Sequence, residues 1–519
     1  MAKLRIPISG LGKIIFPILL NMKRLLLFSF AILIAFPIWA EKQNVILEQC
    51  DVLSFDKSHG SEYQVLKGNV RFRHGAALMY CDSAYFYDND SFDAFGHVKV
   101  VDKGSTMSSE KMFYDGQTTL MKVRGNVVAV NEGTTLSTNS LDFYRDKNYG
   151  YYVGGGKIVD ADFTLDSEKG YYYPSSKNYF FKSNVVVNHP DYIIKSDSLQ
   201  FNNETGKMTL VGPSYIYEKD RTIYTTNAKM NRKTQQGNLY DYSVVTTKDG
   251  QRLTADSIYY DADKKLAKAY HNVEAQDSSQ KLVARGNFAL FDGKDNSNGF
   301  ITDNSYVIDY SEKDSLFLAA DTIFGIEIDS SRNEIRAYSH VKFYREDMQG
   351  RCDSMVYSSS DSILAMYGSP ILWSEESQLT GKQINIYFKN QKADYIHITK
   401  DAMIVQFEAE DMYNQLSSKE SKAYLKNNRM TRMEMLGNAI SIYYSKDDRG
   451  GLIGVNKANG DAMTIYMKNS KKVEKIVMTP DSEGVLYPPL GVPEEEKKLP
   501  RFSWLEDSRP KAKADIFTK

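Results

Sequence analysis

Apolar and polar residues alternate along much of this chain. Within residues 66–73, Leu66, Val70 and Phe72 fall on one face of an extended chain, and polar residues fall on the other. A period of two residues indicates a β-strand that buries one face. Short turn-forming stretches, such as 88–90 and 202–206, separate these segments. The sequence therefore predicts an all-β protein with strands of about five to eight residues.

Two short motifs recur in alternation, which indicates that the chain is built from repeats. The first motif is a polar pair followed by apolar and aromatic residues, and its copies begin at positions 82, 110, 139, 168, 197, 227 and 256. The second motif is Gly-Asn-Val or a near relative, as at 68–70, 96–98 and 125–127. About a dozen repeats with a period of roughly 29 residues are expected between positions 66 and 444.

A single repeat of this kind cannot bury its apolar face, whereas a stack of repeats can. We therefore expect an elongated stack with an apolar stripe along its length. The period of two leaves two interpretations open, a groove that takes up a lipid and a closed core without a ligand. The residues predicted to form the stripe are Leu66, Val70, Phe72, Phe86, Val98, Val100, Met112, Tyr114, Val127, Leu141, Phe143, Val185, Leu199, Phe201, Ile258, Tyr260 and Val273.

Shifts in composition suggest four regions. Residues 1–40 are predicted to be a signal peptide, 45–295 a first array of repeats, and 296–480 a second, more divergent array. The boundary rests on the polar stretch 292–299, and one continuous array with an extended loop is the alternative. Residues 481–519 are rich in proline and charge, which predicts disorder, although Phe502 and Trp504 would suit docking.

The first forty residues are typical of an export signal. Met22 precedes a basic pair, an apolar run follows, and Ala40 offers a small residue for cleavage, so the true start of translation could be Met22. An uncleaved membrane anchor is the alternative. Cleavage would remove five basic residues and no acidic one, which would lower the formal net charge from −1 to −6. An acidic surface argues against a nucleic-acid partner.

Candidate reactive groups coincide with repeat positions. A row of carboxylates and amides (Asp82, Glu110, Asn139, Glu168, Asp197, Asn227 and Asp256) begins the successive copies of the first motif. Interchange of Asp, Asn and Glu suggests local hydrogen bonding at turns rather than acid–base catalysis or calcium binding. His97, His271 and His340 recur near the second motif, and Cys81 and Cys352 are interpreted as buried residues of strands. We expect no enzyme activity, no metal and no cofactor.

The couplet of Leu-Lys-Gly-Asn-Val at 66–70 and Asp-Ser-Ala-Tyr-Phe-Tyr at 82–87 resembles the OstA/LptA-like family of periplasmic lipopolysaccharide-transport bridges, and it recurs at 123–127 and 139–144. The resemblance covers most of residues 45–445 and thins after about 300. It implies an open β-jellyroll of stacked antiparallel strands, V-shaped in section, whose groove shields acyl chains.

The resemblance also implies partners and a location. These are the acyl chains of lipopolysaccharide, other lipopolysaccharide-transport proteins joined end to end by strand addition, self-association, and the periplasm close to the outer membrane. The hypothesis is therefore a lipid-shielding bridge or chaperone. Two alternatives stay open at this point, a carbohydrate-active parallel β-helix enzyme and a structural or adhesive exported repeat protein.

Overall fold

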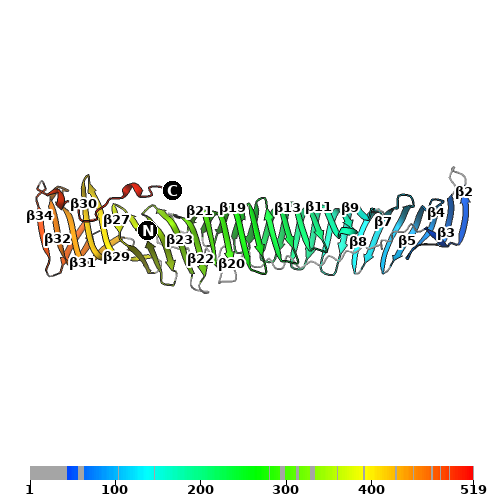
Figure 1. The fold of residues 1–519 in the computed structure, drawn as a ribbon, viewed down its shortest axis with the longest axis horizontal. Coiled ribbons are helices and arrows are strands. Elements are labelled where there is room, and N and C mark those ends of the chain that lie inside the picture. The colour runs from blue at the N-terminus through cyan, green and yellow to red at the C-terminus, as the bar shows by residue number, and fades with distance from the viewer. Residues whose placement is uncertain are drawn as a thin grey trace. The chain divides into compact units, whose positions relative to one another are not determined.

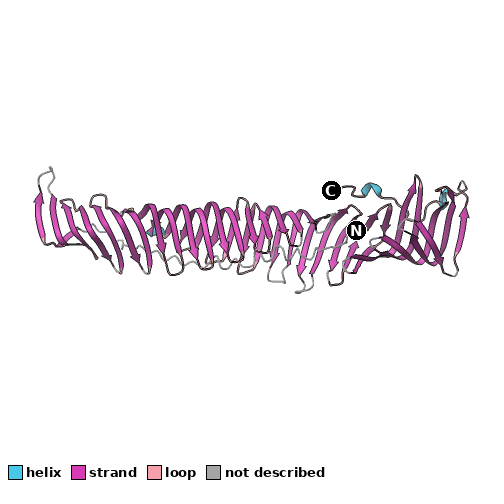
Figure 2. Cartoon of the chain, turned by 180° about the vertical axis from the view of Figure 1, so that it is seen from behind, coloured by secondary structure: helices cyan, strands magenta, loops and turns pink. Residues whose placement is uncertain are grey.

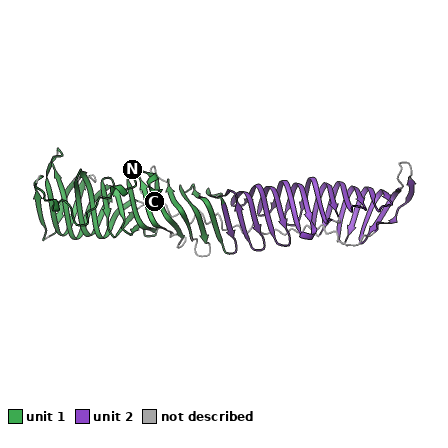
Figure 3. Cartoon of the chain, turned by 45° about the horizontal axis from the view of Figure 1, so that its top comes forward, with its two compact units in different colours: residues 1–19, 247–256, 264–519 green, residues 20–246, 257–263 purple. Residues whose placement is uncertain are grey.

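A computed structural model describes residues 44–517, except 57–62, 103, 132, 145–146, 280, 293–297, 311–314, 328–332, 359, 390–391, 427–428, 448, 469–471, 480 and 490. The predicted signal peptide lies outside the described residues. The described chain forms two compact units, shown in different colours in Figure 3. Unit 2 contains residues 44–246 and 257–263, and unit 1 contains residues 247–256 and 264–517.

Unit 2 is built almost entirely from strands, and Figure 1 shows them following one another in chain order. One short 3-10 turn, η3 (Pro174–Ser176), connects two of them. The strands are β1 (Ile46–Gln49), β2 (Val52–Asp56), β3 (Tyr63–His74), β4 (Ala77–Tyr87), β5 (Phe92–Asp102), β6 (Ser105–Asp115), β7 (Leu120–Asn131), β8 (Thr134–Tyr144), β9 (Tyr149–Val159), β10 (Thr164–Tyr173), β11 (Asn178–His189), β12 (Tyr192–Asn202), β13 (Lys207–Glu218), β14 (Arg221–Asn231), β15 (Gln236–Tyr240), β16 (Ser243–Thr247) and β18 (Ser257–Asp261).

Unit 1 repeats this construction and ends in 3-10 turns, which Figure 2 shows as short helical pieces. These turns are η4 (Glu494–Glu496), η5 (Glu506–Ser508) and η6 (Lys513–Phe517). Its strands are β17 (Gln251–Ala255), β19 (Leu266–Asp277), β20 (Leu282–Asp292), β21 (Asn298–Asp309), β22 (Leu316–Glu327), β23 (Asn333–Arg345), β24 (Met348–Ser358), β25 (Ile363–Tyr367), β26 (Ile371–Ser374), β27 (Ser377–Thr380), β28 (Gln383–Lys389), β29 (Lys392–Ala409), β30 (Met412–Lys426), β31 (Arg429–Lys446), β32 (Leu452–Lys468), β33 (Lys472–Met478) and β34 (Glu483–Tyr487).

The strands of each unit pair antiparallel, mostly with their neighbours in sequence. In unit 2, for example, β3 pairs with β4 and β4 with β5, and in unit 1, β30 pairs with β31 and β31 with β32. The prediction of an all-β stack of antiparallel strands is confirmed. Most strands of unit 2 are longer than predicted: β3 to β14 each contain 10–12 residues, because two of the predicted short segments join in each.

The join between the two halves of a strand is a sharp bend. The β3–β4 register shifts at the middle of the strands, between the pairs Lys67–Ser83 and Val70–Cys81. Phe72 of β3 pairs with Met79 of β4, and Met79 lies seven residues before Phe86, a distance of roughly 23 Å in a straight strand. The rings of Phe72 and Phe86 are nevertheless 5.5 Å apart. The strands therefore fold over at the bend, and their two halves form two facing walls.

The Gly-Asn-Val motif forms this bend. Gly125 and Asn126 both have positive φ angles, 78° and 45°, and the same holds for the first two residues of the other copies of the motif, such as 68–69, 96–97 and 183–184 in unit 2 and 271–272 and 437–438 in unit 1. Glycine adopts this conformation without a steric penalty, and asparagine tolerates it better than most residues. We call residues before each motif the first wall, for example 63–67 of β3, and residues after it the second wall, for example 70–74.

The proposed boundary between two arrays differs from the division that the structure shows. Strands β20 and β21 flank the polar stretch, pair with each other from Leu282–Asp309 to Asp292–Asn298, and both belong to unit 1. The predicted boundary therefore falls between two paired strands of unit 1. The two compact units divide between positions 246 and 264, where no comparable run of turn residues marks the sequence.

The C-terminal segment is also different from the prediction. The sequence predicts disorder for 481–519, but β34 pairs with β32 and Leu499 is buried in an apolar cluster of unit 1. The composition that suggests disorder is accommodated because the segment packs through a few apolar side chains while its charged residues face solvent or pair with the sheet. In the described part of the chain, no helix is long and apolar enough to span a membrane.

Candidate functional site

The predicted apolar stripe lies between the two walls. Fifteen of its seventeen residues are buried, with Phe143 the most exposed of them at 9%. Phe86 and Tyr114, at first-wall positions near the N-terminal end of unit 2, are half-buried. Sixteen of the residues belong to unit 2, and Val273 belongs to unit 1. The structure thus places the sixteen residues of unit 2 along the interior between its walls.

Side chains from the two walls meet across this interior. The ring of Phe92, from the first wall, stacks on Phe72 of the second wall with centroids 5.2 Å apart, and it also contacts Tyr114 at 5.4 Å. Near the bend, the hydroxyl groups of Tyr152 and Ser167 are hydrogen bonded at 2.6 Å, again from opposite walls. The interior of unit 2 is therefore occupied by its own side chains along most of its length.

Strands β7 to β11 are an exception, because they leave a hollow between the walls. The hollow is small and partly open to solvent. Its lining is apolar apart from tyrosine hydroxyls and consists of Met121, Leu136, Leu141, Phe143, Gly150, Tyr151, Tyr152, Ile158, Gly170, Tyr171, Tyr172, Tyr179 and Phe181. An apolar lining of this kind suits a hydrocarbon group better than a polar ligand.

Inward-facing glycines shape the hollow, and the sequence analysis missed them. A Cβ atom on Gly170 would lie 2.3 Å from the ring of Tyr152, and one on Gly156 would lie 2.4 Å from the same ring. These glycines therefore make room for the tyrosine. The signal in the sequence is a glycine at an inward position next to paired tyrosines, as in Gly150-Tyr151-Tyr152 and Gly170-Tyr171-Tyr172.

The far edge of the interior, away from the bend, is polar. In unit 2, Glu218 and Arg221 of the second wall form an ion pair at 3.0 Å, and their side chains are only 4% and 0% exposed. Burial raises the pKa of Tyr260 on the first wall, and the charge of Glu218 raises it further, so the two walls approach each other here. Burial also raises the pKa of Tyr192, and the charges of Asp191 and Glu218 raise it further. The edge thus carries buried charged and phenolic groups rather than purely apolar side chains.

The carboxylate row is accounted for by the bends. Glu110 accepts a hydrogen bond from Asn126 at 2.6 Å, and Glu168 accepts one from Asn184 at 2.6 Å. A Cβ atom on Gly125 would lie 2.5 Å from the Glu110 carboxylate, so this side chain covers the glycine directly. Each of these carboxylates supports the left-handed pair of the next strand, which agrees with the structural interpretation made from the sequence.

Histidine and cysteine occupy structural positions as well. His97 pairs with Asp82 at 2.7 Å and His340 with Asp321 at 2.8 Å, each in the slot that asparagine fills in other repeats. Cys81 and Cys352 are buried, and burial raises the pKa of both thiols to about 12, so neither is a reactive thiolate. Among the described residues, no group of three or more His, Cys, Asp or Glu side chains is placed to hold a metal ion.

Every strand pairing described above is antiparallel, which argues against the alternative of a parallel β-helix enzyme. A parallel β-helix pairs each strand with a parallel neighbour. The registers of β3 to β14 in unit 2 and of β29 to β32 in unit 1 run antiparallel throughout. The structure therefore does not support the carbohydrate-active β-helix enzyme.

Comparison with known proteins identifies two family matches. Residues 42–197 match the family described as OstA-like protein, and residues 222–392 match the family described as LptA/(LptD N-terminal domain) LPS transport protein. No curated protein matches the chain. A solved structure that resembles it is that of LptH from Pseudomonas aeruginosa, described as the LptA homologous periplasmic component of the conserved lipopolysaccharide transport device. The two share 14% identity over 28% of this chain and 96% of LptH, with a TM-score of 0.20.

Proposed function

The chain belongs to the OstA/LptA-like family over the two matched segments, and from this premise we propose that it is a lipid-shielding bridge or chaperone of the periplasm. In this proposal it carries lipopolysaccharide toward the outer membrane, with the acyl chains between the two walls. The observation that carries the proposal is the apolar interior of unit 2, with its hollow between β7 and β11.

Hydrophobic transfer supplies the driving force. Each CH₂ group that leaves water for an apolar surface contributes about 0.8 kcal/mol. A stripe of Val, Leu, Phe and Tyr side chains provides that surface at every repeat without a deep specific site. Near-uniform binding along the stripe lets an acyl chain move from repeat to repeat, because no single position holds it much more tightly than the next.

Loading requires the walls to separate, because side chains now fill most of the interior. The polar far edge favours such an opening, since the groups that part there, including Tyr260 and Glu218, can form hydrogen bonds with water instead. The bend with its left-handed residues acts as the fixed side of this opening. The hollow beside Tyr152 offers an acyl chain a place to enter between the walls.

The end strands are suited to association with other transport proteins or with further copies. In unit 2, β2 pairs with β3 and exposes Val52, Leu53 and Phe55, the last of these at 68%. In unit 1, β34 pairs with β32 and exposes Val485 and Leu486. An edge strand with exposed apolar residues is a template for strand addition. We propose such end-to-end contacts, with a location in the periplasm close to the outer membrane.

Site-specific photocrosslinking tests the proposal. A photoreactive residue is placed at Phe143, which lines the hollow, and at its neighbour Tyr144, which points outward on the same strand. Phe72 and the outward-facing Arg71 form a second matched pair. Incubation with lipopolysaccharide is expected to give adducts from Phe143 and Phe72 but not from Tyr144 and Arg71. Equal labelling from both faces would contradict transport through the interior and favour a structural or adhesive repeat protein.

A further inference from the structure

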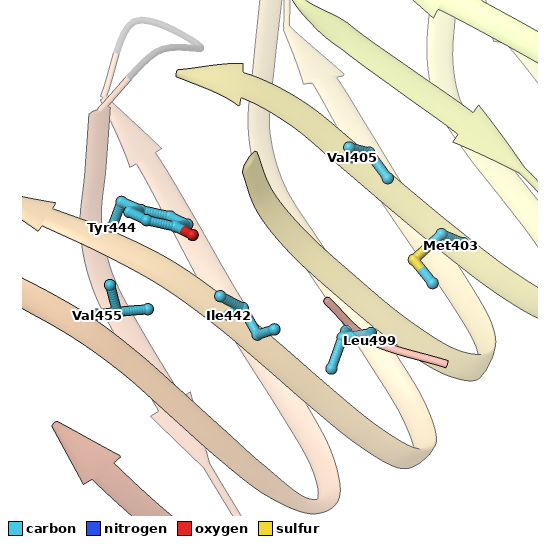
Figure 4. Packing of buried hydrophobic residues seen from close by; sticks show 6 residues of the cluster. All are labelled: Met403, Val405, Ile442, Tyr444, Val455 and Leu499. Atoms are coloured by element: carbon cyan, nitrogen blue, oxygen red, sulfur yellow. The ribbon is translucent and has the colours of Figure 1, made fainter. Parts of the chain in front are cut away.

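In unit 1, a C-terminal segment covers part of the outer surface of the second wall. After β34 the chain turns back, and residues 494–517, here called the strap, run across the strands of that wall. In β29, Lys400 and Asp401 form the bend, so Ala402 and Ile404 point inward and Met403 and Val405 point outward. Figure 4 shows Leu499 of the strap against Met403, Val405 and other outward residues. We call this covered surface the strap face.

Glutamine side chains of the strap face hold the backbone of the strap. The amide of Gln415 donates to the carbonyl oxygen of Lys497 at 2.7 Å, and its oxygen accepts from the Leu499 N–H at 2.8 Å. Gln378 repeats this arrangement farther along, donating to the Ser503 carbonyl at 2.8 Å and accepting from the Leu505 N–H at 2.7 Å. Each glutamine thus bonds one carbonyl and one N–H group of an extended backbone, as side chains of a peptide-binding groove do.

Apolar side chains anchor the same segment. Leu499 is buried among Met403, Val405, Ile442, Tyr444 and Val455. Next along the strap, the ring of Phe502 lies 5.2 Å from that of Tyr413, and the indole of Trp504 lies 5.6 Å from Tyr413 and 6.2 Å from Phe407. The anchors therefore follow a pattern of positions i, i+3 and i+5.

Charged residues fix the direction of the strap. Arg501 pairs with Asp401 at 2.9 Å and donates to the hydroxyl of Ser417 at 3.1 Å. Arg509 donates to the side-chain oxygen of Gln349 at 2.8 Å and to the carbonyl of Glu375 at 3.0 Å. Because each arginine meets a different partner along the wall, a strap bound in the reverse direction would lose these contacts.

The strap is not part of the sheet. Among the described residues, its backbone-to-backbone hydrogen bonds are local, such as Phe502 to Leu499 and Ser508 to Leu505. It can therefore leave without breaking the pairing of any strand. Departure would uncover Val405, now 0% exposed and packed against Leu499, whereas Tyr215, an outward residue of the second wall in unit 2, is exposed among the described residues.

We propose that the strap face is a docking surface for an extended peptide and that the strap is its resident, separable ligand. The peptide that fits has the anchors of the strap and an arginine ten residues after the leucine, and the strap itself, from the same chain or from a second copy, supplies it. This inference does not depend on lipid transport, and its test contains no lipid.

The test uses the full chain and a labelled synthetic peptide of residues 492–517. In the chain with Leu499→Ala and Trp504→Ala, peptide binding is expected to be about tenfold or more tighter than in the unchanged chain, whose own strap competes at an effective concentration of roughly millimolar. Adding Gln378→Ala and Gln415→Ala is expected to remove this gain. A peptide carrying the same two alanines serves as the control and is expected to bind weakly to every variant.

Hydrogen exchange of the strap's own amides, at 499–505, accompanies the binding measurement, because the N–H groups of Leu499 and Leu505 are bonded to Gln415 and Gln378 only while the strap is bound. The proposal expects protection there to fall in the weakened chain and to stay low when the peptide occupies the strap face. Unchanged protection would show that the strap does not separate, and lost protection without peptide binding would show that it is only a cover; either result overturns the proposal. A second variant, Arg501→Ala with Arg509→Ala, loosens the strap through side chains outside the apolar cluster, so the test survives if the first variant fails to fold.

Discussion

At the scale of single residues, this chain uses one local conformation many times. The left-handed pair at each bend needs a residue that tolerates positive φ and a partner that satisfies the exposed polar groups around it. Glycine, asparagine, serine and histidine share the first role, and Asp or Glu from the preceding repeat fills the second, as Glu110 does for Asn126. The residues that most resemble a catalytic row are therefore the ones that the fold itself requires.

His97 makes one of these bends sensitive to pH. Its hydrogen bond to Asp82, together with the charge of that carboxylate, raises the pKa of the imidazole above its ordinary value of 6.5. A raised pKa in the folded state means that the stabilisation is fully present below pH 6.5 and is lost as the pH rises through the higher folded value. We expect an NMR titration of His97 to have its midpoint above 6.5.

The substitution His97→Asn is the matched control, because asparagine fills the same slot in other repeats, as Asn126 does. This variant is expected to lose the part of the pH dependence of unfolding that His97 contributes between pH 6 and pH 8, a range of roughly one unit on either side of a histidine pKa. Identical pH profiles for the two proteins, or a midpoint at or below 6.5, would show that the pair with Asp82 does not form in solution.

At the scale of elements, the unit of construction is a bent strand rather than a straight one. The alternation of apolar residues predicts each half correctly, but it contains no information about the angle between the halves. The Gly-Asn-Val motif does contain it, because two successive positive φ angles turn the chain out of the plane of the sheet. Taken only as a marker of the repeat, the motif predicts the period but not the bend that divides each strand between two walls.

The substitution Gly125→Ala tests the bend. An alanine there would keep the strained φ of 78° and place its Cβ 2.5 Å from the Glu110 carboxylate. The backbone term costs about 1–2 kcal/mol, and displacement of Glu110 from Asn126 adds about 1 kcal/mol.

Gly104→Ala is the comparison, since Gly104 has a φ of 90° and open space around it. Gly104→Ala is expected to lose only the stability that the positive φ angle costs, about 1–2 kcal/mol. Urea unfolding of both variants measures the difference, and an equal loss of stability would show that the carboxylate does not brace the bend.

At the scale of the whole molecule, the sequence predicts the features that recur in every repeat and does not predict the features that occur only once. The stripe, the period of the repeat and the family are evident because they recur in every repeat. The hollow depends on a few glycines facing Tyr152, and the strap depends on partners such as Gln378 and Gln415 that lie 80 or more positions before it. Composition alone indicates disorder for that segment, since its anchors are few and the residues that receive them are far away in sequence.

The central claim is that the interior between the walls carries acyl chains. Calorimetry of the full chain with lipopolysaccharide, and with the same lipopolysaccharide after removal of its acyl chains, tests it most directly. We expect binding of the intact lipid with a negative heat-capacity change, because apolar surface leaves water, and loss of binding once the acyl chains are removed. Equal binding of the deacylated glycan would contradict the account and place recognition on the outer, polar surface.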